Sequence, residues 1–293
     1  YSNHFKQRKP RIAVDCGGGA MTLSAPQVMT AVGAEVELVN GETDPFFRGR
    51  PSEPKPDNLV EMKDRVLEKD LDFGVAFDGD GDRAVVVDDT GRFLSTDRLG
   101  IIIASNLVAK NQGGLVLANV ESSMAVEDVL MPIGARVKRI KVGHTFLTLE
   151  AKQHEAIFGV EKSGHLIVPE HVLFDDAIVA PLEVMRIINS EGRKLSEIAN
   201  EIPQYETDSK AFNCPDDLKF QVVYNLREEL KKTKEKVNDM DGGRVDMEEG
   251  WVLIRCSNTS PVIRMTVEAR SKASLKKIAD EYSSMLEEEI ERI

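Results

Sequence analysis

Strand-like apolar runs alternate with helical segments through the first two hundred residues, and this alternation constrains the fold more than any other feature. The run Arg11–Cys16 leads into the turn Gly17–Gly19 and a helical segment, Ala25–Val32, after which Glu35–Val39 again has the pattern of a strand. This order forms a βαβ unit and predicts an α/β fold. The glycine turn could also cradle a phosphate. Because it has neither a GxGxxG nor a GK[ST] pattern, we interpret it as a tight turn between strand and helix.

The pattern changes twice along the 293 residues, a length typical of two or three domains. A second α/β block begins near Asp97, which we expect to cap the helix Arg98–Ala109. After Pro203 a charged helix is followed by short strands and a closing helix. The predicted fold class is α/β: two α/β domains with mixed sheets, followed by a small α+β C-terminal domain. The predicted domains are residues 1–97, 98–204 and 205–293. Further predicted elements are helices over Asp175–Ser190, Pro215–Lys236 and Ser274–Glu288 and an extended segment at Lys210–Phe212.

Composition argues against several function classes. The net charge of −12 opposes general binding of nucleic acid, whose phosphates attract basic proteins. The longest apolar stretch, Leu99–Ala109, is far shorter than the ~20 residues that cross a bilayer. No two of the cysteines, Cys16, Cys214 and Cys256, are close in sequence, so neither a disulfide framework nor a zinc knuckle is indicated. We therefore expect a protein of a reducing compartment, the cytoplasm, with neither nucleic acid nor membrane as a partner.

Three carboxylates alternate with glycines in the loop Asp78-Gly-Asp-Gly-Asp-Arg83, between two apolar strands. Oxygen ligands at alternating positions of a tight loop converge on one hard divalent cation, and without a cation they repel one another. A metal beside Arg83 suits a phosphate that is being transferred. An acidic solvated turn is the plainer alternative, but it leaves the adjacent arginine unexplained.

Two other functions were weighed for this loop. A calcium EF-hand needs Gly and Glu where Arg83 and Asp89 stand, and it lies between helices rather than strands. A metal-dependent sugar phosphatase of the haloacid-dehalogenase type would use Asp78 as its nucleophile. That motif needs Thr or Val at the position of Asp82. Both alternatives therefore fit the loop less well than a divalent metal site for phosphoryl transfer.

Two further loops carry polar side chains. In Gly159–His165, Glu161 can accept hydrogen bonds from both hydroxyls of a vicinal diol and Ser163 can support one of them, although an ordinary polar loop is the alternative. The second loop leaves one strand and enters the next with the sequence RCSNTSP. Its guanidiniums, hydroxyls, amide and backbone N–H groups can surround a phosphate dianion, and a polar hairpin turn is the alternative. The candidate phosphate ligands are Arg255, Ser257, Asn258, Thr259 and Arg264.

Together the three loops resemble those of the α-D-phosphohexomutases, and more narrowly the phosphomannomutase/phosphoglucomutase branch. DGDGDR is similar to the family's magnesium loop, and GVEKSGH to its sugar-binding loop, GExSGH. RCSNTSP is similar to the phosphate loop in the RxSNTxP form of the mannose and glucose branch, whereas the glucosamine branch more often has SGTEP. Val160, where a second glycine is common, and the loop NVESSM, which lacks the family's usual lysine, are departures. They leave proton transfer and sugar preference open.

The resemblance implies a role for each loop. Mg²⁺ would be held by Asp78, Asp80 and Asp82, with Arg83 contacting the transferred phosphate. Glu161, Ser163 and His165 would bind the substrate, the first two through the 3- and 4-hydroxyls of the sugar. The C-terminal loop would hold the phosphate that is not transferred. His144 lies where this branch often has an active-site histidine, a general acid or base or a phosphate ligand, although it could also be a structural residue at a helix N-terminus.

The implied reaction interconverts hexose 1-phosphate and hexose 6-phosphate of mannose or glucose through a phosphoserine and a hexose 1,6-bisphosphate. The family has four domains, and the three predicted here correspond to the second, third and fourth. No TASHNP-like segment with the reactive serine occurs in the sequence. We therefore expect a fragment that is inactive alone. A non-catalytic sugar-phosphate-binding homologue and a phosphoglucosamine mutase are the alternatives, and a homodimer is left open.

Overall fold

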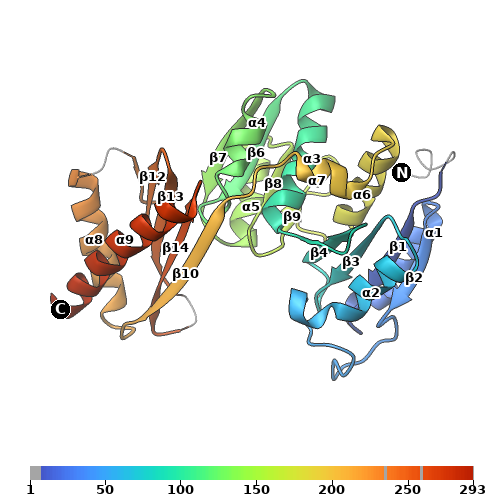
Figure 1. Ribbon diagram of the computed structural model, residues 1–293, viewed down its shortest axis with the longest axis horizontal. Helices are drawn as coiled ribbons and strands as arrows, with labels where there is room; N and C mark the ends of the chain where they lie inside the picture. The colour runs from blue at the N-terminus through green and yellow to red at the C-terminus, as the bar shows by residue number, and fades with distance from the viewer. Residues whose placement is uncertain (1–7, 234–235, 258–259, 293) are drawn as a thin grey trace. The chain divides into compact units, whose positions relative to one another are not determined.

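The chain folds as two compact units in a computed structural model that describes residues 8–233, 236–257 and 260–292 (Figure 1). The first unit comprises Tyr1–Ala118, Val126–Lys138 and Gly143–Pro203. The second unit comprises Asn119–Ala125, Arg139–Val142 and Gln204–Ile293.

A mixed five-stranded sheet in the order β2-β1-β3-β4-β5 forms the first part of unit 1. Its strands are β1 (Arg11–Asp15), β2 (Glu35–Val39), β3 (Phe73–Phe77), β4 (Ala84–Asp88) and β5 (Phe93–Leu94). Strand β1 is parallel to both neighbours, whereas β3 and β4 are antiparallel and pair Phe77 with Ala84. The acidic loop is therefore a short hairpin connection that lies at the end of the sheet where β1 also ends.

Four helical segments accompany this sheet: η1 (Ala20–Leu23), α1 (Ala25–Ala31), η2 (Pro56–Asn58) and α2 (Val60–Glu68). Helix α2 buries Met62 and Val66 against Ala13, Ala76 and Val87 of the sheet. These contacts explain the 3.6-residue spacing of apolar residues in α2, because only one side of this surface helix meets the core.

A second mixed sheet, in the order β7-β6-β8-β9, carries the predicted sugar loop. Its strands are β6 (Gly114–Asn119), β7 (Ala135–Ile140), β8 (Phe158–Val160) and β9 (Leu166–Ile167). Strands β6 and β8 are parallel, and β8 turns back antiparallel into β9 through residues 161–165. The associated helices are α3 (Thr96–Asn111), α4 (Ala125–Leu130), α5 (His144–His154), α6 (Val179–Glu191) and α7 (Leu195–Asn200).

Four predicted helix starts are wrong by a few residues: the helices predicted from Arg98, Asp175, Pro215 and Ser274 begin at Thr96, Val179, Lys219 and Lys272. Ser95, and not Asp97, caps α3, because its side chain accepts a hydrogen bond from the backbone N–H of Arg98 at 3.2 Å. Helix α6 begins at Val179 rather than Asp175. There the Asp176 carboxylate accepts a hydrogen bond from the backbone N–H of Ile178 at 3.0 Å and holds the preceding residues in a turn.

The C-terminal sheet is antiparallel throughout, with the order β10-β14-β13-β12-β11. Its strands are β10 (Glu206–Asn213), β11 (Val237–Asn238), β12 (Gly243–Met247), β13 (Gly250–Cys256) and β14 (Val262–Ala269). Helices α8 (Lys219–Thr233) and α9 (Lys272–Arg292) pack against it and against each other (Figure 1). The predicted fold class is confirmed. Strand β10 is longer than the predicted Lys210–Phe212. The sequence underestimates its length because β10 is an edge strand whose mostly exposed side chains show no apolar pattern.

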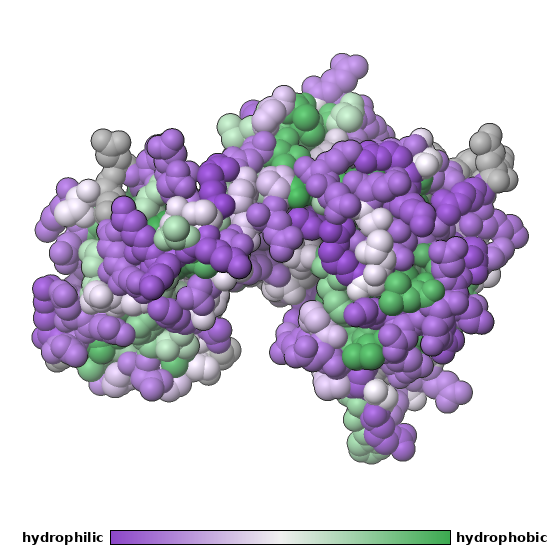
Figure 2. All heavy atoms as spheres, viewed as in Figure 1, coloured by the Kyte–Doolittle hydropathy of each residue, from purple (hydrophilic) through white to green (hydrophobic). Residues whose placement is uncertain are grey.

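The face of the molecule in Figure 2 is mostly hydrophilic, with apolar residues in scattered patches. Charged residues make up 30% of the chain. None of the helices in the part of the chain that the structure describes is long and apolar enough to cross a membrane.

The cysteines are expected to react slowly in the folded chain. Burial and the neighbouring Asp15 carboxylate raise the pKa of Cys16 to about 12, and burial raises the pKa of Cys256 to about 11. The thiolate is the reactive form, so labelling by a disulfide reagent at pH 8 should be at least ~100-fold slower than for free glutathione. Urea should abolish the protection. Peptide mapping after labelling is the measurement, and rapid modification of Cys16 without denaturant would contradict this environment.

Candidate functional site

The acidic loop brings three carboxylates together at the hairpin between β3 and β4. One oxygen each from Asp78, Asp80 and Asp82 lie within 4.8 Å of one another. Asp78 is buried and Asp80 is exposed, so the cluster reaches from the protein interior to solvent. Three carboxylates this close repel unless cations lie among them.

Arg83 supplies one such cation to Asp78. Its Nε donates to Asp78 Oδ2 at 2.6 Å, and the backbone N–H groups of Arg83 and Gly81 donate to Asp78 Oδ1 at 3.1 and 3.0 Å. Burial of Asp78 opposes its ionisation, but the hydrogen bonds from the backbone and side chain of Arg83 outweigh burial and lower the pKa of Asp78. Asp78 therefore stays a carboxylate inside the protein.

Asp82 shows that the loop is suited to a further cation. Its buried Oδ1 accepts no hydrogen bond from the residues that the structure describes, and it lies 3.6 Å from Arg83 Nε. Burial and the adjacent Asp78 carboxylate raise the pKa of Asp82. A buried carboxylate oxygen that accepts no hydrogen bond and lies beside two other carboxylates is a suitable ligand for a hard divalent ion such as Mg²⁺. The residues present therefore fit the metal that the motif predicts.

The carboxylate of Glu161 in the second loop, residues 159–165, is held by the N-terminus of the neighbouring helix α5. Glu161 is buried, and its Oε1 accepts a 2.6 Å hydrogen bond from the backbone N–H of Gly143, the residue before α5. Ser163 is exposed, and its hydroxyl lies 3.4 Å from Glu161 Oε2 and 2.9 Å from His165 Nδ1. The carboxylate and the hydroxyl are thus adjacent, as recognition of a diol requires.

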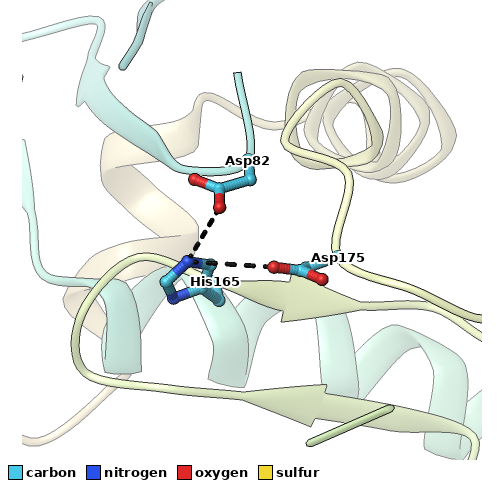
Figure 3. Close-up of side chains that lie close together, drawn as sticks. All are labelled: Asp82, His165 and Asp175. Carbon is cyan, nitrogen blue, oxygen red and sulfur yellow. Dashed lines mark hydrogen bonds and ion pairs between the residues drawn. The ribbon is translucent and has the colours of Figure 1, made fainter. Parts of the chain in front are cut away.

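His165 connects the two loops. Its Nε2 lies 3.2 Å from Asp82 Oδ2 and 3.8 Å from Asp175 Oδ2 (Figure 3). Its Nδ1 lies 3.5 Å from Glu161 Oε2. Burial alone would lower the pKa of His165, but Glu161 and Asp82 outweigh burial and raise it. The imidazole therefore lies among three carboxylates, and its protonated form offsets part of their charge.

His144 belongs to the same group. It begins α5, its side chain is 55% exposed, and its Nδ1 lies 3.3 Å from Asp175 Oδ2. Its ring stacks on that of His165, with centroids 5.3 Å apart. The exposed ring can exchange protons with solvent or with a bound molecule, while Asp175 and His165 hold its orientation.

The C-terminal loop lies in unit 2, between β13 and β14. Arg255 and Arg264 are partners across the two strands; Arg264 is exposed, and Arg255 Nε donates to Glu121 Oε1 at 2.7 Å. Ser257 is buried, and its carbonyl accepts a 2.7 Å hydrogen bond from Lys219 Nζ. Of the predicted phosphate ligands, Asn258 and Thr259 lie outside the described residues.

Three charged residues near these loops are absent from the predicted set. They are Asp175, Glu121 and Lys219, which contact His144, Arg255 and the Ser257 carbonyl respectively. Each comes from a segment distant in sequence from the group it contacts. Their local sequences contain no motif that indicates these contacts. Lys219, for example, has the pattern of an ordinary helical lysine.

Three family models match successive parts of the chain. The matching family models are described as phosphoglucomutase/phosphomannomutase alpha/beta/alpha domain II over residues 1–91, alpha/beta/alpha domain III over residues 95–205 and C-terminal domain over residues 216–284. Together they include the acidic loop, the sugar loop and the C-terminal loop.

Similar proteins carry related names. A probable phosphoglucosamine mutase of Methanopyrus kandleri is 34% identical over 97% of this chain and 63% of its own length. A phosphoglucomutase/phosphomannomutase of Thermococcus kodakarensis is 32% identical over 97% of this chain and 62% of its own length. The chain therefore spans somewhat less than two thirds of these relatives.

A solved structure of a protein with a related name is also similar to this chain. The phosphoglucomutase/phosphomannomutase family protein of Burkholderia thailandensis superposes with a TM-score of 0.88 at 26% identity, covering 97% of this chain and 61% of that protein. The chain belongs to the α-D-phosphohexomutase superfamily.

Proposed function

We propose that this chain supplies the metal-binding, sugar-binding and phosphate-binding loops of a phosphohexomutase that interconverts hexose 1-phosphate and hexose 6-phosphate. The observation that carries the proposal is the contact between His165 of the sugar loop and Asp82 of the acidic loop, at 3.2 Å. Two motifs more than eighty residues apart in sequence meet where a sugar carrying a phosphate would need both.

The acidic loop is assigned to the phosphoryl group in transfer. Mg²⁺ would be held by Asp78, Asp80 and Asp82, and when bound it neutralises charge on the phosphoryl oxygens. Arg83 places a guanidinium beside these carboxylates, with its Nε on Asp78 and its Nη1 3.5 Å from Glu53. The remaining guanidinium N–H groups are suited to donate to a phosphate oxygen.

The sugar loop is assigned to the hydroxyl groups. Glu161 accepts hydrogen bonds from two adjacent sugar hydroxyls, and Ser163 supports one of them. His165 keeps this carboxylate and Asp82 close together despite their like charge. His144, exposed and oriented by Asp175, is assigned to proton transfer at the hydroxyl that receives or loses the phosphoryl group.

The C-terminal loop is assigned to the phosphate that stays on the sugar. Its proposed ligands are Arg255, Ser257, Asn258, Thr259 and Arg264. The exposure of Arg264 supports this role, since a free guanidinium is needed for a bidentate contact with phosphate oxygens. The domain division 1–97, 98–204 and 205–293 belongs to the same proposal.

The serine that carries the phosphoryl group is assigned to a segment outside these 293 residues, because no TASHNP-like sequence occurs among them. In the complete reaction, phosphoserine transfers its phosphoryl group to the free hydroxyl of the hexose phosphate, giving the 1,6-bisphosphate. The bisphosphate turns over and returns its other phosphoryl group to the serine. This chain alone is expected to bind sugar phosphates without interconverting them.

Three sugars are candidates, and two separate observations favour different ones among them. The RCSNTSP form of the C-terminal loop favours mannose or glucose phosphates. The names of similar proteins, such as the phosphoglucosamine mutase of Methanococcus maripaludis at 35% identity, favour glucosamine phosphate. Titration with the three 1-phosphates under identical conditions distinguishes them, since the preferred sugar should bind most tightly.

Replacement of Asp80 by asparagine should weaken divalent metal binding. The change removes a charged ligand without altering the buried part of the loop, so affinity for Mg²⁺ or Mn²⁺ should fall at least roughly tenfold by calorimetric titration. Asp64→Asn on α2 is the matched control, because this exposed residue loses the same charge. Equal affinities for Asp80→Asn and the wild-type chain would contradict the metal assignment.

Replacement of Arg264 by alanine should weaken binding of hexose 1-phosphate in the presence of Mg²⁺. A hydrogen bond to a charged group contributes about 1.5–3 kcal/mol, which corresponds to a ~10- to 100-fold loss of affinity. Lys276→Ala, an exposed residue of α9, loses the same charge and should change affinity less than twofold. Wild-type binding that survives Arg264→Ala unchanged would contradict the role given to this loop.

A further inference from the structure

A buried ion pair lies immediately behind the acidic loop. Asp15, the last residue of β1, accepts hydrogen bonds from Arg50 Nε through both carboxylate oxygens, at 3.1 Å each. The side chains are 1% and 2% exposed. A buried charged pair of this kind contributes little net stability compared with apolar residues of the same volume, so its presence calls for a role in positioning.

One of the other guanidinium nitrogens of Arg50 reaches β3, the strand that leads into the acidic loop. Nη2 donates to the carbonyl of Phe77 at 2.6 Å, and Nη1 donates to the carbonyl of Pro51 at 3.0 Å. The carbonyl of Phe77 shares its peptide plane with the N–H of Asp78, and that N–H donates to the carbonyl of Arg83 at 3.3 Å. The peptide bond from which Asp78 projects is therefore held on both sides.

The glycine turn after β1 is shaped around the same contacts. Gly17 has φ of +58°, and a Cβ there would lie 2.6 Å from the central carbon of the Arg50 guanidinium. A Cβ on Gly19 would lie 2.5 Å from the carbonyl oxygen of Gly79, which accepts a hydrogen bond from the N–H of Ala20 at 2.9 Å. The turn thus packs directly on Arg50 and on the acidic loop.

The backbone N–H groups of this turn are already engaged. Gly17 donates to Asp15 Oδ1, Gly18 to the carbonyl of Asn40 and Gly19 to the carbonyl of Cys16, at 2.8, 3.0 and 2.9 Å. The turn consequently offers no set of free N–H groups to a phosphate. Its glycines serve the close approach of Arg50 and the loop.

We propose that Arg50, neutralised by Asp15, is a positioning residue that fixes the backbone at Asp78 so that the three carboxylates of the acidic loop converge on one cation. This inference rests on the metal-binding role proposed above. The guanidinium of Arg50 donates to Asp15 and to backbone carbonyls, and it acts on the loop through the carbonyl of Phe77.

The test compares two double variants of this chain. Asp15→Asn with Arg50→Met removes both charges, so neither remains buried without a partner, and the introduced amide would keep an oxygen for the N–H of Gly17. Glu183→Gln with Arg186→Met is the matched control, because it removes a largely buried carboxylate–guanidinium pair on α6 of the same unit. The readouts are Mn²⁺ affinity by calorimetry and amide hydrogen exchange of residues 79–83.

The Asp15/Arg50 variant should bind Mn²⁺ roughly 10- to 100-fold more weakly, as is usual when a residue that orients metal ligands is lost, and should exchange faster at residues 79–83. The control should match the wild-type chain in both. Provided that Asp80→Asn weakens Mn²⁺ binding, a folded Asp15/Arg50 variant with wild-type Mn²⁺ affinity would overturn the proposal, whatever its exchange rates.

If that variant does not fold, Arg50→Lys decides, because it keeps the charge opposite Asp15 and loses the hydrogen bond to Phe77. Weaker Mn²⁺ binding would support the proposal, and unchanged binding would overturn it. If Asp80→Asn and the wild-type chain bind Mn²⁺ equally, the metal role itself fails. Hydrogen exchange at residues 79–83 then decides alone whether Arg50 holds the loop.

Discussion

Repulsion among carboxylates is the constraint around which the first unit is organised. Asp78, Asp80 and Asp82 crowd within 4.8 Å of one another, and Glu161 and Asp175 flank the same histidine that contacts Asp82. Such a concentration of negative charge unfolds a loop unless cations and hydrogen-bond donors are fixed around it. Arg83 and His165 supply the cationic groups, and the backbone N–H groups of the hairpin supply donors. Oδ1 of Asp82 accepts no hydrogen bond from the described residues and is therefore suited to a further cation.

This arrangement links local sequence to chemistry. An antiparallel hairpin at the end of β3 forces alternating residues of a short loop into proximity, and parallel pairing of β1 with β3 brings the glycine turn to the same sheet edge. The second unit brings together positive rather than negative side chains. Its sheet pairs Arg255 with Arg264 across neighbouring strands and places cationic groups beside a loop of hydroxyl-bearing residues. The carboxylates that we propose for a metal and the guanidiniums that we propose for a phosphate thus come from separate units.

Local motifs could be predicted from the sequence, whereas long-range partners could not. The acidic loop, the sugar loop and the fold class depend on spacing within ten residues or on apolar periodicity. Asp175 was interpreted only as the start of a helix, because its contact with His144 depends on how the segment before α6 folds back. Arg50 and Lys219 likewise look like surface residues in sequence, yet both are buried and donate to backbone carbonyls. Side-chain contacts across sheets leave no periodic pattern.

Anomalous diffraction from crystals of this chain grown with Mn²⁺ tests the central claim most directly. The account predicts one strong peak within coordination distance of carboxylate oxygens of Asp78, Asp80 and Asp82, with His165 beside the site and outside the first shell. The alternative group of Asp82, His165 and Asp175 also has ligand atoms within 4.8 Å of one another. A peak at that group, or no peak at the hairpin between β3 and β4, would contradict the account.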